Sequence, residues 1–99
     1  MTVERLLLLS FVIFSIGLFG VLARRHVIAI LLSLELMFNS VNLAILAVAW
    51  HQGWLTGVLI VLFGIAITVA EVAIGLSLFL LAERLRRTTC ADDLSSLKG

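Results

Sequence analysis

Three long stretches of apolar residues occupy most of the chain, and each is long enough to cross a lipid bilayer. They run from Leu6 to Ala23, from Val27 to Trp50 and from Leu55 to Ala82. About 18 or more consecutive apolar residues indicate a transmembrane helix. Backbone groups inside a bilayer must form their hydrogen bonds internally, which a helix does within one segment. We therefore predict an all-α integral membrane protein with three transmembrane helices, over residues 6–23, 27–50 and 55–82.

The composition excludes most classes of soluble protein. Hydrophobic residues make up 63% of the chain and charged residues 13%, whereas about a quarter of a soluble domain is charged. A net charge of +1 does not suit a nucleic-acid binder, and the single cysteine, Cys90, cannot form an internal disulfide. We predict one membrane domain, residues 1–99, that ends in a polar cytoplasmic tail, residues 83–99. Within that tail we expect residues 88–99 to be extended.

Basic residues are divided unequally between the two membrane faces. The short connections at residues 24–26 and 51–54 make neighbouring helices antiparallel, so the first connection and the tail share one face. The opposite face carries Arg5 alone. The shared face carries Arg24, Arg25, Arg84, Arg86, Arg87 and Lys98. Because cytoplasmic segments are enriched in Lys and Arg, we predict that the N-terminus faces outside and the C-terminus lies in the cytoplasm.

Two acidic residues, Glu35 and Glu71, interrupt the apolar stretches. They lie about 12 Å and 17 Å from the cytoplasmic ends of their helices, as counted from the rise per residue. Both therefore lie near the middle of a bilayer core about 30 Å thick. Ionisable residues at this depth are costly and mark functional sites by default. We predict that the pair relays protons, and the alternative is that protonated glutamates only hold helices together.

The residues around the two glutamates differ. Glu35, Asn39 and Asn42 share one face of the second predicted helix. The asparagines either join helices by hydrogen bonds or hold water beside the carboxyl group. On the third helix, the face of Glu71 also carries Thr68 and two glycines, Gly64 and Gly75, which favour close helix packing.

No other residue pattern predicts chemistry within this chain. His26 and His51 lie at opposite membrane faces, so they cannot jointly bind a haem, and we expect both to be solvated. We predict no metal and no cofactor in this chain. Arg24 and Arg25 either set the topology or attract an anionic partner. Because three short helices with a polar stripe bury little by themselves, the chain is expected to be part of a larger assembly.

Several motifs together resemble one protein family. They are Arg24-Arg25, the segment Leu34–Met37 with Asn39 and Asn42, the segment Ala70–Leu76, and the ending Asp92–Gly99. These resemble subunit K of proton-pumping NADH–quinone oxidoreductase, respiratory complex I. The resemblance covers nearly the whole chain, and the turn His51–Trp54 departs from the usual pattern of an acidic residue followed by Gly-Gln.

The resemblance implies a membrane-arm subunit in a bacterial inner membrane, packed among other hydrophobic subunits. It implies that Glu35 and Glu71, and only these two residues, belong to a chain of buried ionisable groups that couples quinone reduction to proton pumping. From the residue pattern itself, we expect Asn39, Asn42, Arg24 and Arg25 to support this path. The chain would then be an enzyme only as a subunit. NADH, FMN, iron–sulfur clusters and quinone are implied for other chains of such a complex.

Other readings of the sequence remain open. A small subunit of a multisubunit cation/proton antiporter usually lacks the glutamate in its second helix, so Glu35 argues against it. A multidrug exporter of the small type has four helices, and an ATP synthase rotor subunit is a two-helix hairpin with one carboxylate. A purely structural membrane subunit is the non-catalytic alternative.

The unequal distribution of basic residues predicts where the C-terminus lies. We expect a cysteine introduced near Lys98 to react with a membrane-impermeant thiol reagent only from the cytoplasmic side. Labelling of intact cells and of inverted membrane vesicles measures this. Labelling from outside would contradict the predicted topology.

Overall fold

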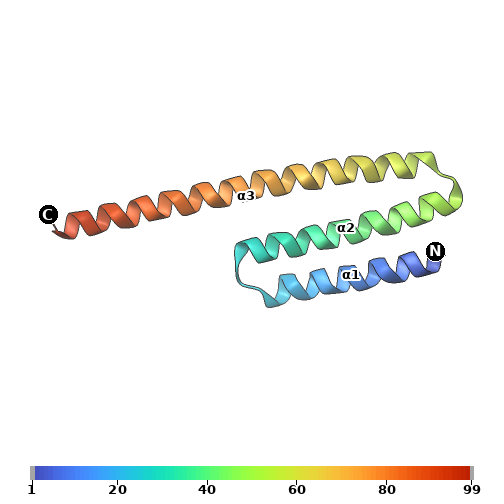
Figure 1. Ribbon diagram of the computed structural model, residues 1–99, viewed down its shortest axis with the longest axis horizontal. Coiled ribbons are helices and arrows are strands. Elements are labelled where there is room, and N and C mark those ends of the chain that lie inside the picture. The colour runs from blue at the N-terminus through green and yellow to red at the C-terminus, as the bar shows by residue number, and fades with distance from the viewer. Residues whose placement is uncertain (1, 99) are drawn as a thin grey trace.

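The computed structural model describes residues 2–98 and consists of three helices joined by two short connections (Figure 1). α1 spans Val3–Ala23, α2 spans Val27–Gln52 and α3 spans Leu55–Lys98. Each helix is long and apolar enough to cross a membrane, which confirms the prediction of an all-α protein with three such helices. Met1 and Gly99, the two ends of the predicted domain, lie outside the described residues. The orientation of the termini in the membrane stays a prediction.

Local signals in the sequence explain where the helices begin and end. The Thr2 hydroxyl accepts a hydrogen bond from the backbone N–H of Arg5 at 3.3 Å, which caps the start of α1. At the start of α2, the Nδ1 atom of His26 accepts from the backbone N–H of Ile28 at 3.2 Å. α2 ends at Gln52 and is capped by Gly53, whose φ of 65° is left-handed and favours glycine.

The expectation of an extended tail over residues 88–99 is wrong for the described part of that segment. α3 continues without a break to Lys98 and extends beyond the α1–α2 connection (Figure 1). Proline is absent from the chain, and no glycine lies between Gly75 and Gly99, so nothing in this segment interrupts the helix. An ion pair of 3.6 Å between Arg86 and Glu83, three residues apart, adds local support.

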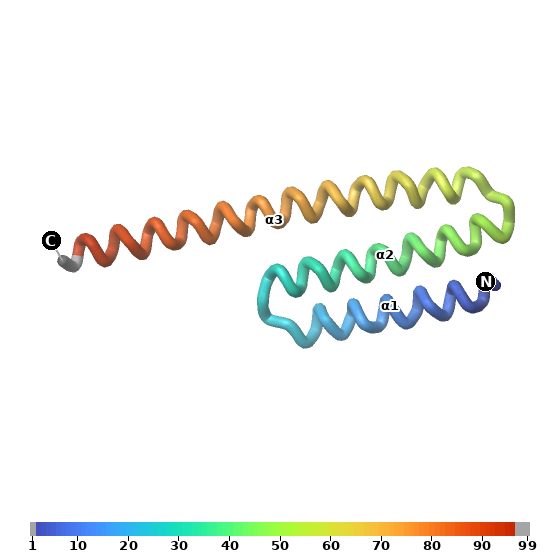
Figure 2. The backbone as a smooth tube through the Cα atoms, viewed as in Figure 1, coloured from blue at the N-terminus to red at the C-terminus, as the bar shows by residue number. Residues whose placement is uncertain are grey.

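The three helices lie side by side in one layer, with α2 in the middle (Figure 2). α2 packs against both neighbours, and over the described residues α1 and α3 do not contact each other. The molecule measures 70 × 26 × 14 Å, so the layer is about one helix thick. The side chains that this layer buries are small, namely Ser10, Ser40, Ala47, Ala49 and Val61. The large apolar side chains are left for lipid or for other chains to cover.

Glycines determine how closely the helices approach each other. A Cβ atom on Gly17 of α1 would lie 2.6 Å from the Cγ atom of Met37 on α2, which is too close for a carbon–carbon contact. A Cβ atom on Gly57 of α3 would likewise lie 2.6 Å from the Cβ atom of Ala49. Small residues allow this kind of close backbone approach between membrane helices. α1 and α3 are therefore each held against α2 by positions that tolerate no side chain.

Replacing Gly57 by alanine tests this close approach. We expect Gly57→Ala to lower the free energy of unfolding by about 1–3 kcal/mol, the usual cost of overpacking. Gly75→Ala is the matched control, because a Cβ atom there would meet Leu31 at an ordinary 3.6 Å. Alanine favours a helix over glycine by up to ~1 kcal/mol, so the control is expected to be neutral or stabilising. Circular dichroism of the chain in detergent, titrated with SDS, measures both. Equal effects would contradict the packing described here.

Candidate functional site

Contacts at three levels define the register of α2 against α3. In each of them a glycine of α3 faces a side chain of α2. The distances below run from a Cβ atom built on each glycine to the nearest atom of the facing side chain. The distance is 3.6 Å for Gly75 and Leu31, 2.9 Å for Gly64 and Asn42, and 2.6 Å for Gly57 and Ala49. Each step forward along α2 is matched by an equal step back along α3. The two helices are therefore antiparallel with one constant register, and we call this line of contact the α2–α3 seam.

The register brings Glu35 and Glu71 to the same level of the seam. Four residues forward from Leu31 is Glu35, and four residues back from Gly75 is Glu71. Residues four apart share one face of a helix, so both glutamates lie on the faces along which α2 and α3 meet. Two acidic residues that are far apart in the sequence thus form one pair.

The two glutamates differ in how far this chain covers them. Glu35, on the central helix, is half-buried, whereas Glu71 on α3 is exposed. The difference follows from the single layer, because α2 has a neighbour on each side and α3 has α2 alone. Glu71 is therefore open to whatever lies beside α3 in the membrane. The pair has one protected member and one accessible member.

The two asparagines that share the face of Glu35 have different environments. Asn42 packs against Gly64, and its Nδ2 atom is buried without a hydrogen-bond partner among the described residues. Asn39 is exposed. A buried amide donor without a partner costs free energy until it finds an acceptor. Of the two asparagines, Asn42 is the one that belongs to the seam.

Arg24 and Arg25 lie in the α1–α2 connection, and both are exposed. Eight residues of α2, from Val27 to Leu34, lie between this connection and Glu35, which corresponds to about 12 Å along the helix. The two arginines are therefore not in contact with the glutamate pair. His26, which follows them, is exposed as expected, but it also caps α2, and its ring contacts the ring of Phe79 on α3 at 5.9 Å between centroids. Sequence reasoning missed this contact. The position of His26 directly before an apolar helix was the available signal.

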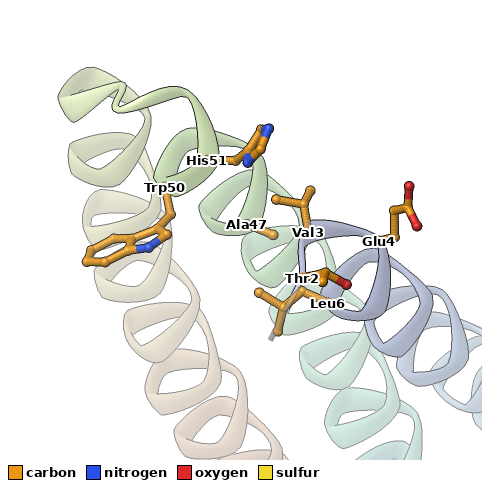
Figure 3. A pocket seen from close by; sticks show the side chains of 7 residues that line it. All are labelled: Thr2, Val3, Glu4, Leu6, Ala47, Trp50 and His51. Carbon is orange, nitrogen blue, oxygen red and sulfur yellow. The ribbon is translucent and has the colours of Figure 1, made fainter.

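One pocket lies far from the glutamates, where α1 begins and α2 ends (Figure 3). Its lining includes Glu4 and His51, which lie on opposite sides of Val3 (Figure 3). It is an open hollow beside the α2–α3 turn. The pocket and the glutamate pair are thus separate features at different levels of the molecule.

Side chains that commonly bind metal ions are scattered in the part of the chain that the structure describes. Cys90 is the only cysteine in the sequence and is exposed on α3. Over residues 2–98, no three His, Cys, Asp or Glu side chains come together as a metal-binding group. At the seam, the acidic side chains are those of Glu35 and Glu71, and a carboxyl group can gain or lose a proton.

Comparison with known proteins gives a consistent result over nearly the whole chain. Residues 5–99 match the family described as NADH-ubiquinone/plastoquinone oxidoreductase chain 4L. NADH-quinone oxidoreductase subunit K of a Thermus thermophilus strain is 45% identical over 93 residues, which are 94% of this chain and 97% of the relative. Subunit K of Roseiflexus castenholzii is 39% identical over 94% of this chain and 93% of its own length.

The register of the seam can be tested by cross-linking. In a Cys90→Ser background, we expect Glu35→Cys and Glu71→Cys to be joined efficiently by a short thiol-to-thiol reagent. The matched control pairs Glu35→Cys with Val69→Cys, because Val69 is 63% exposed and lies on the opposite face of α3. Mass spectrometry of the digested protein measures the cross-linked fraction. A higher yield from the control pair would show that the register is wrong.

Proposed function

Because the chain belongs to the family of NADH–quinone oxidoreductase subunit K, also described as chain 4L, we propose that it serves the membrane arm of a proton-translocating enzyme and that Glu35 and Glu71 relay protons there. The enzyme couples the reduction of quinone to proton pumping across the membrane. This chain contributes no redox centre to it. Its contribution is the pair of carboxyl groups at the α2–α3 seam.

The observation that carries this proposal is the meeting of Glu35 and Glu71 in one register. A single buried carboxyl group can be explained as a hydrogen bond that holds helices together. Two carboxyl groups that face each other repel when both are ionised, and desolvation makes each charge more costly. Such a pair is favourable when it holds one proton between its members. A shared proton that can move from one side to the other is the basis of a relay.

The proposed step is a proton transfer between the two carboxyl groups. When Glu35 is protonated and Glu71 is ionised, the proton leaves the Glu35 oxygen and a water or neighbouring side chain passes it to the Glu71 carboxylate. The charge moves in the opposite direction, from Glu71 to Glu35. Because Glu71 is exposed on α3, it exchanges its proton with groups outside this chain. Glu35 receives the next proton from the side of α2.

Asn42 and the two arginines would support this step in different ways. The unpartnered Nδ2 donor of Asn42 lies two helical turns from Glu35 on the same face and would bind a water or an acceptor of a neighbouring chain. Asn39, which is exposed, would extend the polar path toward a neighbour. Arg24 and Arg25 would act at the membrane surface, where cationic residues set topology and attract anionic groups.

The proposed setting is the inner membrane of a bacterial cell. There the apolar faces of the layer would be covered by lipid and by other hydrophobic subunits of the membrane arm. FMN, iron–sulfur clusters and the NADH and quinone sites would belong to other chains. The relatives reported above are named as subunits of NADH–quinone oxidoreductase, which favours this setting over a cation/proton antiporter.

Separate replacement of the glutamates tests the relay. We expect Glu35→Ala to lower quinone-linked proton pumping by about 100-fold, the lower end of what a positioned proton-transfer group contributes. Glu71→Ala should lower it less, because its open side allows water or a neighbouring group to take its place. Glu→Asp should be milder at either position. Pumping is measured in membrane vesicles, with the content of assembled complex quantified in parallel.

Glu4→Ala is the matched control, since Glu4 is exposed in the first turn of α1 and distant from the seam. We expect it to pump normally. Both glutamate variants should still assemble, because removing a charge from the bilayer core removes an insertion cost of about 2.5–3.5 kcal/mol. Normal pumping by Glu35→Ala would exclude the relay for that residue. Loss of assembly would favour a purely structural subunit.

A further inference from the structure

Five of the six arginines gather at the end of the molecule where the α1–α2 connection lies beside α3. They are Arg24, Arg25, Arg84, Arg86 and Arg87, and all five are exposed. Over residues 2–98, the one ion pair joins Arg86 to Glu83. Because Glu83 is the only acidic residue among residues 24–26 and 83–87, this cluster has a net charge of +4.

The charges along α3 are sorted by their distance from the apolar stretch. Arg87 lies five residues beyond Ala82, where that stretch ends, which corresponds to about 7.5 Å. The headgroup region adds about 5–7.5 Å to each side of the apolar core of a bilayer. Asp92 and Asp93 lie about 15 Å beyond Ala82 and therefore outside that region. The arginines thus lie at the depth of the lipid phosphates, and the acidic pair does not.

A ring contact brings two parts of this cluster together. The rings of His26 and Phe79 lie 5.9 Å apart between centroids, which places the α1–α2 connection beside α3. Arg25 directly precedes His26, and Arg86 lies two turns beyond Phe79 on the same face of α3. α3 continues past the connection (Figure 1), and the Arg86 side chain is 76% exposed there. Arg25 and Arg86 therefore flank the end of the α2–α3 seam.

The surface on the membrane side of these arginines is apolar. Val27, the first residue of α2, is 54% exposed, and Leu78, next to Phe79, is 60% exposed. Because the layer is about one helix thick, the acyl chains of a lipid can lie along the seam at this level. Guanidinium groups bind phosphate by paired hydrogen bonds. A cationic pair above an exposed apolar surface matches a molecule with an anionic head and apolar chains.

We propose that Arg25 and Arg86, with Arg24 beside them, bind the phosphate of an anionic phospholipid at this end of the α2–α3 seam. The ion pair with Glu83 positions the Arg86 side chain. A zwitterionic lipid also has a phosphate, but its cationic headgroup is repelled by the net charge of +4. The depth of the arginines favours a lipid over an acidic segment of a soluble chain, because such a segment would also meet Asp92 and Asp93.

Tryptophan quenching by brominated lipids measures which lipid contacts each end of the molecule. The native tryptophans, Trp50 and Trp54, lie at the opposite end, near the α2–α3 turn. In a variant with both replaced by phenylalanine, Phe79→Trp places an aromatic reporter below Arg86. The full chain is studied in bilayers that mix phosphatidylglycerol with phosphatidylcholine, with one or the other brominated. The ratio of the two quenching efficiencies gives the relative binding constant.

We expect phosphatidylglycerol to be preferred at least fivefold at the Phe79→Trp reporter, because one arginine near an anionic surface contributes about that factor. The native tryptophans should show a ratio near one, since Glu4 and Arg5 at their end cancel in charge. Inorganic phosphate added at constant ionic strength should not change either ratio. A ratio near one at the Phe79→Trp reporter, or loss of the preference on adding phosphate, would overturn the proposal.

Glutamine variants distinguish a site from a diffuse attraction. Arg25→Gln and Arg86→Gln should each lower the preference severalfold. Arg84→Gln is the matched control, because it removes the same charge from the same helix but lies on the side of α3 that faces away from Phe79. We expect Arg84→Gln to retain most of the preference. An equal loss in Arg84→Gln would show that no site exists.

Lipid analysis of the purified complex is the second measurement, and it does not depend on the proton relay. Mass spectrometry counts the anionic lipids that each complex retains. We expect the double variant Arg25→Gln and Arg86→Gln to retain one fewer than Arg84→Gln. An unchanged lipid count with loss of a neighbouring subunit would indicate that an acidic protein segment occupies this position, which would contradict the lipid site.

Discussion

Close backbone contact between α2 and α3 is the constraint on which the rest of this structure depends. Gly57 and Gly64 allow the two helices to meet without intervening side chains, and hydrophobic burial cannot do this work because lipid is as apolar as the helices themselves. Once these contacts form, the position of every other residue along the seam is determined. Glu35 and Glu71 therefore face each other as a result of packing at glycines that have no chemistry of their own.

The polar groups along the seam are costly for the fold that carries them. Each ionised carboxyl group in a bilayer core opposes insertion by about 2.5–3.5 kcal/mol, and the amide of Asn42 adds a buried donor without a partner among the described residues. The same seam thus combines the closest packing with the least favourable polar groups. The close packing holds the two carboxyl groups in place despite this cost.

Much of the fold could be predicted from the sequence, because long apolar stretches admit few structures in a bilayer. The sequence also identifies Glu35 and Glu71 as candidate functional residues, because ionisable side chains are rare at that depth of a membrane. That Glu35 and Glu71 face each other could not be predicted. The apolar stretches indicate how deep each residue lies in the membrane, but they do not indicate how each helix is rotated about its own axis. The continuation of α3 beyond Thr88 was missed because polarity indicates where the membrane ends and not where a helix ends. The different environments of Asn39 and Asn42 also depend on rotation, which only the packed pair of helices defines.

A layer one helix thick has no interior in the sense that a globular protein has one. Nearly every side chain of α1, α2 and α3 has at least one side that this chain does not cover. The stability of such a subunit is consequently a property of the assembly, and it varies with the supply of its neighbours by mass action. A chain made in excess would remain open to chaperones and proteases, so its amount in the cell would follow that of its partners. Regulation of the complex can therefore act on any one subunit and adjust the others through degradation.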